Sequence, residues 1–245
     1  MSFAQACEVL RRLGLHGMAQ SLDDLQVNPA ALRDLALSDL VIKLGEGEQN
    51  LRSTRRLKRL LKAAGLRGDA YPEDIDYRVK RGLDRQLMAD LLSCDWIRRK
   101  QNLFIIGPTG VGKTWIAEAM VSQACRNGMP AAVWRVSKLL SAINVGRGDG
   151  SAPKLHQRLA KLGLLVLDDW GRVPLTVQAR HDLLELVDDR CERGSIAITS
   201  QHPVDKWYDW LNDATVADAL LDRIVHKAHK INLKGDSMRA LKGMG

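Results

Sequence analysis

The stretch GPTGVGKTWIAEAM, residues 107–120, determines how the rest of this 245-residue chain is interpreted. It begins with the pattern G-x-x-x-x-G-K-T, which follows the apolar run NLFIIG and opens a segment with helical spacing. A loop between a strand and a helix presents backbone N–H groups, and the positive end of that helix, to nucleotide phosphates. The residues expected to bind the phosphates are Gly107, Pro108, Thr109, Gly110, Val111, Gly112, Lys113 and Thr114.

Two side chains of this loop have separate expected roles. Lys113 is expected to reach the β- and γ-phosphates, and the Thr114 hydroxyl is expected to bind Mg²⁺. The motif therefore predicts that the chain binds a nucleotide and Mg²⁺.

Further apolar runs follow the helix over roughly residues 113–127, and helical segments separate them. Strands that alternate with helices predict an α/β fold with a parallel sheet and helices on both of its faces. Ser137 is expected to cap a helix over residues 138–145, and residues 146–153 are expected to form a loop. The runs predicted as strands are AAVWRV, GLLVLDD, SIAITS and HKINL.

Two carboxylates end the strand LLVLDD, residues 164–169. Ligands of an open parallel sheet bind at the carboxyl ends of its strands, so both aspartates are expected beside the phosphates. We expect Asp168 to hold Mg²⁺, through water, and Asp169 to orient and polarise the attacking water. The alternative is that the two aspartates only solvate the end of the strand.

The strand SIAITS is expected to lie between the first and third strands of the sheet. That position leaves Thr199, Ser200 and Gln201 near the γ-phosphate, where a polar side chain can position water. An ordinary strand end is the alternative.

Arg223 lies late in a predicted helix over about residues 215–226, far from the phosphate loop in sequence. Such an arginine can stabilise transition-state charge on the nucleotide of a neighbouring subunit, in trans. A surface salt bridge is the alternative.

Residues 1–75 are expected to form a helical domain, because apolar residues recur at helical spacing through FAQACEVLRRLGL and ALRDLALSDLVIKL. Pro72 and nearby acidic residues mark its boundary with an ATPase domain over residues 76–245. Within LRSTRRLKRLLKAAGL, arginines at i, i+3, i+4 and i+7 lie beside an apolar seam, and this single-sign pattern indicates contacts with phosphates, as in DNA. We name this set the arginine stripe: Arg52, Arg55, Arg56 and Arg59. A solvated face, or contact with an acidic partner or a neighbouring subunit, is the alternative.

The overall composition is basic, with a net charge of +8 and a pI of about 9.5. This balance is compatible with a polyanionic partner and equally with a protein that is simply basic. The four cysteines have neither C-x-x-C nor metal spacing, so reduced, mostly buried thiols are expected. No apolar run approaches the ~20 residues of a membrane span, and the N-terminus lacks the apolar segment of a signal peptide. These features predict a cytoplasmic protein with no membrane partner.

Several segments of the chain resemble a known family. The segments NLFIIGPTGVGKTWIAEAM, LGLLVLDDWG, DLLELVDDR and ITSQHPVDKWYDWLNDATVADALLDRIVHKAHKINLKGDSMR are similar to the IstB-like transposition helper ATPases. These are the ATP-binding proteins encoded beside the transposase in insertion-sequence elements, and they are relatives of the DnaC helicase loader within the AAA+ superfamily. The resemblance covers essentially the whole chain.

The resemblance implies an AAA+ core with a five-stranded parallel sheet behind a small, all-helical N-terminal domain. It also implies ATP-dependent assembly of copies of the chain on double-stranded DNA, and recruitment and stimulation of a partner transposase for target-site selection. By the same resemblance, Arg223 is the arginine finger acting in trans, and the sensor position falls on Ser200 or Gln201.

Two features depart from the AAA+ pattern. Many of these proteins have a glutamate where this chain has Asp169, whose shorter side chain implies slow, switch-like hydrolysis. The chain ends about a dozen residues after its last predicted strand, so no full helical lid domain is expected. Arg239 is then the candidate for a second sensor arginine.

Two other functions remain open. A helicase loader would have a replicative helicase ring as its main partner, whereas duplex DNA binding without a helicase favours the transposition factor. A metabolic P-loop kinase would need an acceptor-substrate site and a lid, and the sequence indicates neither.

Overall fold

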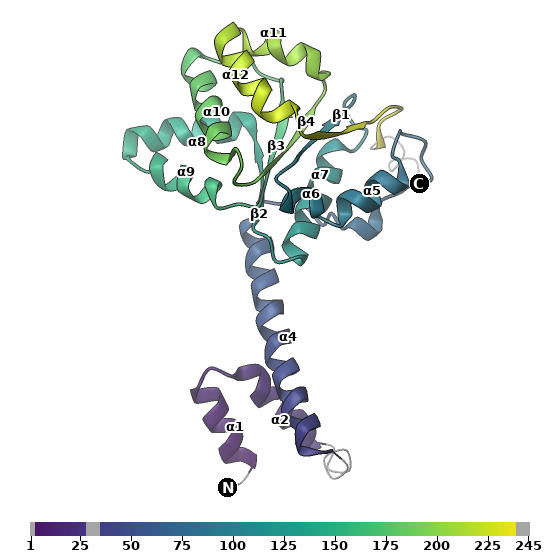
Figure 1. Cartoon of the computed structure of the whole chain (residues 1–245), viewed down its shortest axis with the longest axis vertical. Coiled ribbons are helices and arrows are strands. Elements are labelled where there is room, and N and C mark those ends of the chain that lie inside the picture. The colour runs from purple at the N-terminus through teal and green to yellow at the C-terminus, as the bar shows by residue number, and fades with distance from the viewer. Residues whose placement is uncertain (1–2, 28–34, 239–245) are drawn as a thin grey trace. The chain divides into compact units, whose positions relative to one another are not determined.

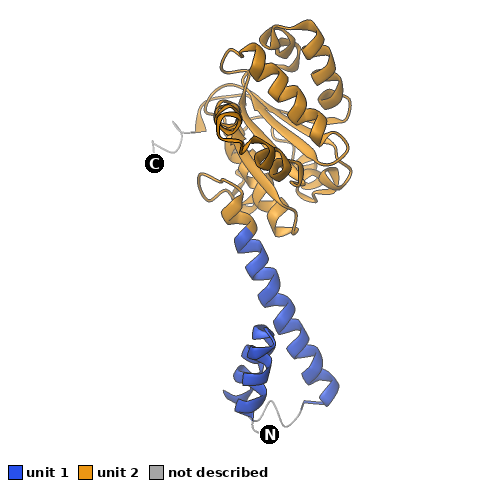
Figure 2. Ribbon diagram, turned by 90° about the vertical axis from the view of Figure 1, so that its left-hand side faces the viewer, with its two compact units in different colours: residues 1–59 blue, residues 60–245 orange. Residues whose placement is uncertain are grey.

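The computed structural model describes residues 3–27 and 35–238. The chain divides into two compact units, residues 1–59 (the helical unit) and residues 60–245 (the core unit), which Figure 2 colours separately. This division falls earlier than the boundary that the sequence placed at residues 75 and 76. The reason is that residues 60–75 contact the rest of the core unit. The N–H of Val133 donates to the Ala64 carbonyl at 2.8 Å, and Arg126 pairs with Glu73.

The described part of the helical unit consists of helices, as predicted. They are α1 (Phe3–Arg12), α2 (His16–Val27) and α4 (Leu37–Ala63), the last of which continues past the end of the unit. Among the described residues of this unit, the buried apolar side chains are Cys7, Ala19, Leu22 and Leu25.

A buried carboxylate joins α2 to α4. Glu48 of α4 accepts the N–H groups of Gly17 at 2.7 Å and Met18 at 3.2 Å, at the N-terminus of α2, where negative charge is favourable. Burial alone would raise the pKa of Glu48, but the hydrogen bonds from Arg52 and from these two N–H groups lower it overall. The ionised carboxylate therefore stabilises the packing of the two helices.

The core unit is built on a five-stranded sheet with the order β2-β3-β4-β1-β5, in which every neighbouring pair is parallel (Figure 1). The predicted position of SIAITS between the first and third strands is confirmed, because β4 pairs with both β1 and β3. Each residue of β1 and β4 is buried, as in strands that are covered on both faces. The strands are β1 (Asn102–Ile106), β2 (Ala131–Arg135), β3 (Leu164–Trp170), β4 (Ser195–Ser200) and β5 (Ala228–Asn232).

Helices cover both faces of this sheet, as predicted (Figure 1). On one face lies α7 (Lys113–Arg126), accompanied by α5 (Arg85–Leu92) and α6 (Asp95–Arg98). The other face is covered by α8 (Val136–Asp149), α9 (Ala152–Ala160), α10 (Val177–Arg190) and α12 (Ala214–Val225). Short helical turns complete the unit: η1 (Pro72–Asp74), η2 (Val204–Lys206) and α11 (Trp207–Leu211).

The helix after β2 is longer than the sequence predicted. It begins at Val136, so Ser137 does not cap it, and it runs to Asp149 through most of the expected loop. Gly146 lies inside the helix because α9 packs there: a Cβ at Gly146 would lie only 2.8 Å from the backbone nitrogen of Ala152. The glycine allows a close helix contact and does not end the helix.

One side chain ties together the amino ends of the central strands. Asn102, at the start of β1, accepts the N–H of Ile196 in β4 at 2.9 Å and donates to the carbonyl of Ile224 in α12 at 3.0 Å. The end of α12 is thereby bonded to the strand that leads to the phosphate loop.

Within the described ranges, no helix combines the length and the apolar character needed to cross a membrane. Cys7, Cys94 and Cys125 are buried free thiols, as expected for most of the cysteines, and Cys191 is an exposed one.

Candidate functional site

The phosphate loop connects β1 to α7, as the sequence predicted. Gly110 and Gly112 have φ values of 90° and 95°, in the left-handed region that other residues rarely adopt. A Cβ on Gly110 would also lie 2.3 Å from Ser237 Oγ. The N–H of Met238 donates to the Gly110 carbonyl at 2.9 Å, so the segment after β5 holds the loop from outside.

Lys113 begins α7 and turns back onto the loop. Its Nζ donates to the carbonyls of Gly107 and Pro108, both at 2.7 Å. Burial lowers the pKa of Lys113, and the charges of Asp169 and Asp168 oppose this shift. Phosphate oxygens are stronger acceptors for an ammonium group than neutral carbonyls. The flexible lysine side chain can therefore exchange these carbonyls for phosphates.

Arg81 supports the loop from beneath and was missed by the sequence analysis. Its side chain is buried, and Nη1 donates to the carbonyl of Val111 at 2.9 Å. Burial lowers the pKa of Arg81. In the sequence RVKRG, nothing distinguishes Arg81 from the exposed Arg78 beside it, so no local signal identifies this contact.

Asp168 connects three parts of the core unit. Its side chain is fully buried at the carboxyl end of β3. Oδ1 accepts the hydroxyls of Thr114, at 2.7 Å, and Thr199, at 2.6 Å, and Oδ2 pairs with Arg67 Nη2 at 2.8 Å. The predicted carboxylate and the predicted hydroxyl thus lie together at the start of α7.

This pair of oxygen donors fits Mg²⁺, which prefers oxygen ligands and usually takes few of them from the protein when phosphates supply others. Across the described residues, no cluster of three or more His, Cys, Asp or Glu side chains could hold a metal. Thr114 and Asp168 are the residues whose oxygens would hold Mg²⁺ beside a nucleotide, and this role stays a prediction.

Thr199 lies closest to the two aspartates among the polar residues at the end of β4. Its Oγ1 donates to Asp168 Oδ1 and accepts the N–H of Asp169 at 3.2 Å. This hydroxyl fixes the position of one aspartate relative to the other. The sequence named Thr199 as near the γ-phosphate but gave the sensor role to its neighbours.

Those neighbours are placed differently. The Ser200 hydroxyl donates to the Trp170 carbonyl at 2.9 Å and accepts the indole N–H of Trp207 at 3.3 Å, so its bonds hold β4 to the surrounding core. Gln201 is exposed immediately after the strand. The structure does not join Ser200 to the aspartates through a side-chain hydrogen bond, and the sensor role of either residue stays a prediction.

Asp169 has an unusual backbone conformation, with a φ of 62°, where the pairing of β3 with β4 shifts register. Its carboxylate Oδ2 lies 3.0 Å from Arg172 Nη1 and 3.4 Å from Arg135 Nε. Asp169 is therefore next to the predicted metal carboxylate but paired with two arginines. An attacking water has to compete with these arginines for the same oxygen.

Glu118 is a second residue that the sequence analysis missed. It lies one helical turn after Thr114 on α7, it is only 5% exposed, and its Oε1 has no hydrogen-bond partner. Burial raises the pKa of Glu118, while a hydrogen bond from the backbone of Arg67 and the charge of Arg67 lower it. The available signal was a glutamate four residues after Thr114 within the otherwise apolar run WIAEAM.

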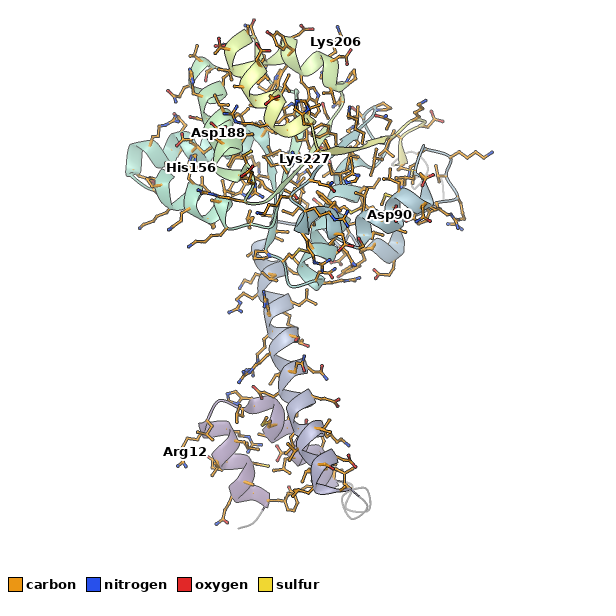
Figure 3. All side chains as sticks on the ribbon, in the orientation of Figure 1. Arg12, Asp90, His156, Asp188, Lys206 and Lys227 are labelled. Carbon is orange, nitrogen blue, oxygen red and sulfur yellow. The ribbon has the colours of Figure 1, made fainter. Side chains whose placement is uncertain are left out.

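Arg223 lies in the last turn of α12, and its Nε pairs with Asp188 of α10, which Figure 3 labels. The next strand, β5, begins at Ala228, which is in register with Asn102 at the start of β1. The phosphate loop follows the opposite end of β1, about 17 Å away along a five-residue strand. Arg223 is therefore remote from the phosphate loop of its own chain.

The arginine stripe lies on one helix, as predicted, because α4 includes all four residues. All four are exposed. Arg52 pairs with Glu48 at 2.7 Å, so part of its charge is compensated within the helical unit. Contact of the stripe with DNA stays a prediction.

Arg239, the candidate second sensor, lies outside the described residues.

Known proteins of one family match this chain over most of its length. A family model described as IstB-like ATP binding protein matches residues 8–243. A putative insertion sequence ATP-binding protein of Sinorhizobium fredii, y4pL, is 45% identical over 230 residues, which are 94% of both chains. The putative ATP-binding protein of insertion sequence IS1162 from Pseudomonas fluorescens is also 45% identical, over 79% of this chain and 84% of its own.

Solved structures show the same fold at low sequence identity. The DnaC helicase loader aligns with a TM-score of 0.53 and 15% identity over 67% of this chain and 97% of its own. AMPPCP-bound DnaA from Aquifex aeolicus aligns with a TM-score of 0.56 and 18% identity over 71% of this chain and 53% of its own. The five-stranded parallel sheet is thus that of the AAA+ proteins, as the resemblance implied. With a family model that matches nearly its full length, the chain belongs to the family of IstB-like ATP binding proteins.

Proposed function

We propose that this protein is a Mg²⁺-dependent ATPase that assembles on duplex DNA and recruits and stimulates a partner transposase for target-site selection. The observation that carries the ATPase part is the bonding of Asp168, at the carboxyl end of β3, to Thr114 at the start of α7 and to Thr199 near the end of β4. The relatives named above as insertion sequence ATP-binding proteins support the role in transposition.

The residues of the core unit suggest how hydrolysis proceeds. Lys113 leaves the loop carbonyls and binds the β- and γ-phosphates, while Thr114 and Asp168 hold the metal. When bound, Mg²⁺ neutralises charge on these phosphates. Asp169 polarises the attacking water, and Thr199 keeps the two aspartates in register. The pairing of Asp169 with Arg135 and Arg172 is consistent with slow turnover.

The catalytic site is completed by a second copy of the chain in this proposal. Arg223 is remote from its own phosphate loop, yet it is partly exposed in the last turn of α12, where it can reach the nucleotide of a neighbour. To do so it must exchange Asp188 for the phosphates. Hydrolysis would then depend on assembly, because one copy supplies Asp169 and another supplies Arg223.

The helical unit is proposed to engage the DNA. Four arginines on a single exposed helix can contact successive phosphates without reading the bases. Such contacts suit a factor that must bind many target sequences.

The direct test mixes the protein with duplex DNA and ATP, images the assemblies by negative-stain electron microscopy, and adds the transposase of the same insertion sequence. We expect filaments or rings that need both ATP and DNA and that increase strand transfer by the transposase.

The helicase loader remains the second candidate, supported by the likeness in fold to DnaC. Binding to a replicative helicase, without assembly on bare duplex DNA, would favour that candidate.

A further inference from the structure

A positive side chain of the protein itself occupies the carboxylate to which the proposed function assigns Mg²⁺. Arg67 Nη2 lies 2.8 Å from Asp168 Oδ2, while Oδ1 accepts the hydroxyls of Thr114 and Thr199. The Asp168 side chain is 1% exposed and that of Arg67 is 40% exposed. The arginine therefore closes the side of the aspartate that the hydroxyls leave open.

Arg67 and Mg²⁺ cannot share this carboxylate without a penalty. Like charges repel strongly at a few ångströms in a partly buried site. Mg²⁺ also keeps several of its waters, and these need carboxylate oxygens as acceptors. A guanidinium on Oδ2 removes one such acceptor. Metal binding at Thr114 thus competes with Arg67.

Glu118 offers the arginine another acceptor. Its Oε1 is buried and has no hydrogen-bond partner, although buried carboxylate oxygens are normally bonded. The Arg67 backbone lies near enough to the Glu118 carboxylate to lower its pKa. The base of the arginine side chain therefore lies beside Glu118 while its end lies on Asp168.

The backbone of this segment is held in place on both sides. The Ala64 carbonyl accepts the N–H of Val133 in the edge strand β2 at 2.8 Å, and the Arg67 backbone lies beside Glu118 of α7. Rotation of the Arg67 side chain alone can move its guanidinium from one carboxylate to the other.

We propose that Arg67 is a positioning residue that pairs with Asp168 before metal and nucleotide bind, and that transfers to Glu118 when they bind. Arg67 then sets the concentration of Mg²⁺ at which the site loads. This inference rests on the proposed function of the nucleotide site.

The test uses the full-length protein and a fluorescent, non-hydrolysable ATP analogue, whose binding is measured at a series of Mg²⁺ concentrations. Binding by the parent protein tests the proposed function by itself. Arg67→Gln removes the charge, and we expect half-maximal binding at an about tenfold lower Mg²⁺ concentration, as for loss of one charged hydrogen bond. Arg67→Lys keeps a competing charge and is expected to stay near the parent. The matched control is Arg98→Gln, which breaks an exposed ion pair with Asp95 in α6 and should change nothing.

Glu118→Gln separates this role from a structural one. With Arg67 present, the variant offers the guanidinium only a neutral amide oxygen in place of a carboxylate, so about tenfold more Mg²⁺ should be needed. In an Arg67→Gln background, Glu118→Gln should have no effect, which is the signature of a coupled pair in a double-mutant cycle. An equal loss in both backgrounds would overturn the proposal. An Arg67→Gln variant that binds the analogue with unchanged or increased Mg²⁺ dependence, in a parent protein that does bind it, would overturn it as well.

Discussion

The phosphate end of the core unit and the arginine stripe of the helical unit are built in opposite ways. The three side chains bonded to Asp168 lie 54, 31 and 101 residues from it in the sequence, and the carboxylate is fully buried. The stripe is confined to one stretch of α4, and its members are exposed. Buried groups that share bonds act as a unit, whereas exposed charges act nearly independently. Substitutions at the first region should therefore abolish a function, and those at the second should reduce it by degrees.

The most complete loss of function is expected from Lys113→Ala, because it removes the cation of the phosphate loop and with it both nucleotide binding and assembly. Affinity for ATP should fall at least a hundredfold, and assembly on DNA that depends on ATP should be lost. A titration with a fluorescent ATP analogue measures the first effect, and electron microscopy measures the second. The exposed Lys161 supplies the control variant Lys161→Ala. Normal assembly of Lys113→Ala with ATP would refute the assignment of the loop.

Arg223→Ala tests whether the site is shared between copies. The variant should bind ATP normally and lose hydrolysis by a factor of about 10³ or more, the range found for arginines that act in trans. Mixing it with Asp169→Asn should restore part of the activity, because one kind of interface then combines an intact Asp169 with an intact Arg223. Lys227→Ala, close by on the chain, is the control. Steady-state ATPase rates equal to the parent for each variant alone would contradict a shared site.

Asp169→Asn should leave ATP and Mg²⁺ binding intact and lower the rate of hydrolysis about 10²- to 10⁴-fold, since the water loses its polarising carboxylate. Assemblies on DNA should then persist after ATP is added, which light scattering can follow over time. The exposed Asp205 provides a control as Asp205→Asn. An unchanged ATPase rate would remove Asp169 from the mechanism.

A graded effect is expected from the stripe. Replacing Arg55 and Arg59 by alanine should weaken binding to duplexes of any sequence and reduce the slope of log K against log salt by about 1.8, if both contact phosphates. Nucleotide affinity should stay unchanged. Titrations at several salt concentrations measure the slope, with Arg12→Ala, in α1, as the control (Figure 3). If the slope holds while transposase stimulation falls, the stripe binds an acidic protein surface instead.

The smallest effect is expected within the helical unit, at Glu48. Because its pKa is lowered from the usual 4.5 in the folded chain, the carboxylate stabilises the unit above that pH, and the stabilisation is lost as the pH falls through the lower, folded value. Glu48→Gln should speed hydrogen exchange at Gly17 and Met18 near neutral pH by a few-fold. The difference between parent and variant should shrink below pH 4.5. Equal exchange rates at neutral pH would show that the charge is unimportant there.

The sequence predicted the features that local patterns encode. Strands, helices and the loop from Gly107 followed from apolar runs and from one motif whose chemistry is carried by consecutive residues. The place of β4 between β1 and β3 was also predicted correctly. Thr114 and Asp168 were each expected beside the phosphates, and the structure joins them by a hydrogen bond. In each case the carboxyl ends of parallel strands meet at one edge, so position along a strand is enough to place the residue.

The missed residues all depend on contacts between distant segments. Arg67 reaches the site from the segment after α4, and Arg81 from a bend before β1. Glu118 lies on the buried side of α7. No periodicity marks them, because their roles are set by what lies opposite in the folded chain. The early end predicted for α8 failed for a related reason: residues 146–153 were expected to form a loop, whereas the packing of α9 places Gly146 inside the helix.

The bonds of Asn102 have a mechanical consequence. This side chain connects the end of α12, which carries Arg223, to the first residue of β1, whose other end carries the phosphate loop. Arg223, which would act on the nucleotide of a neighbouring copy, and the loop that would bind the chain's own nucleotide are thus connected to the two ends of β1. In the proposed assembly, a tilt of one subunit would displace both at once. The geometry around each nucleotide would then depend on the orientation of two neighbouring subunits. A change at one interface would therefore alter the next interface in the assembly.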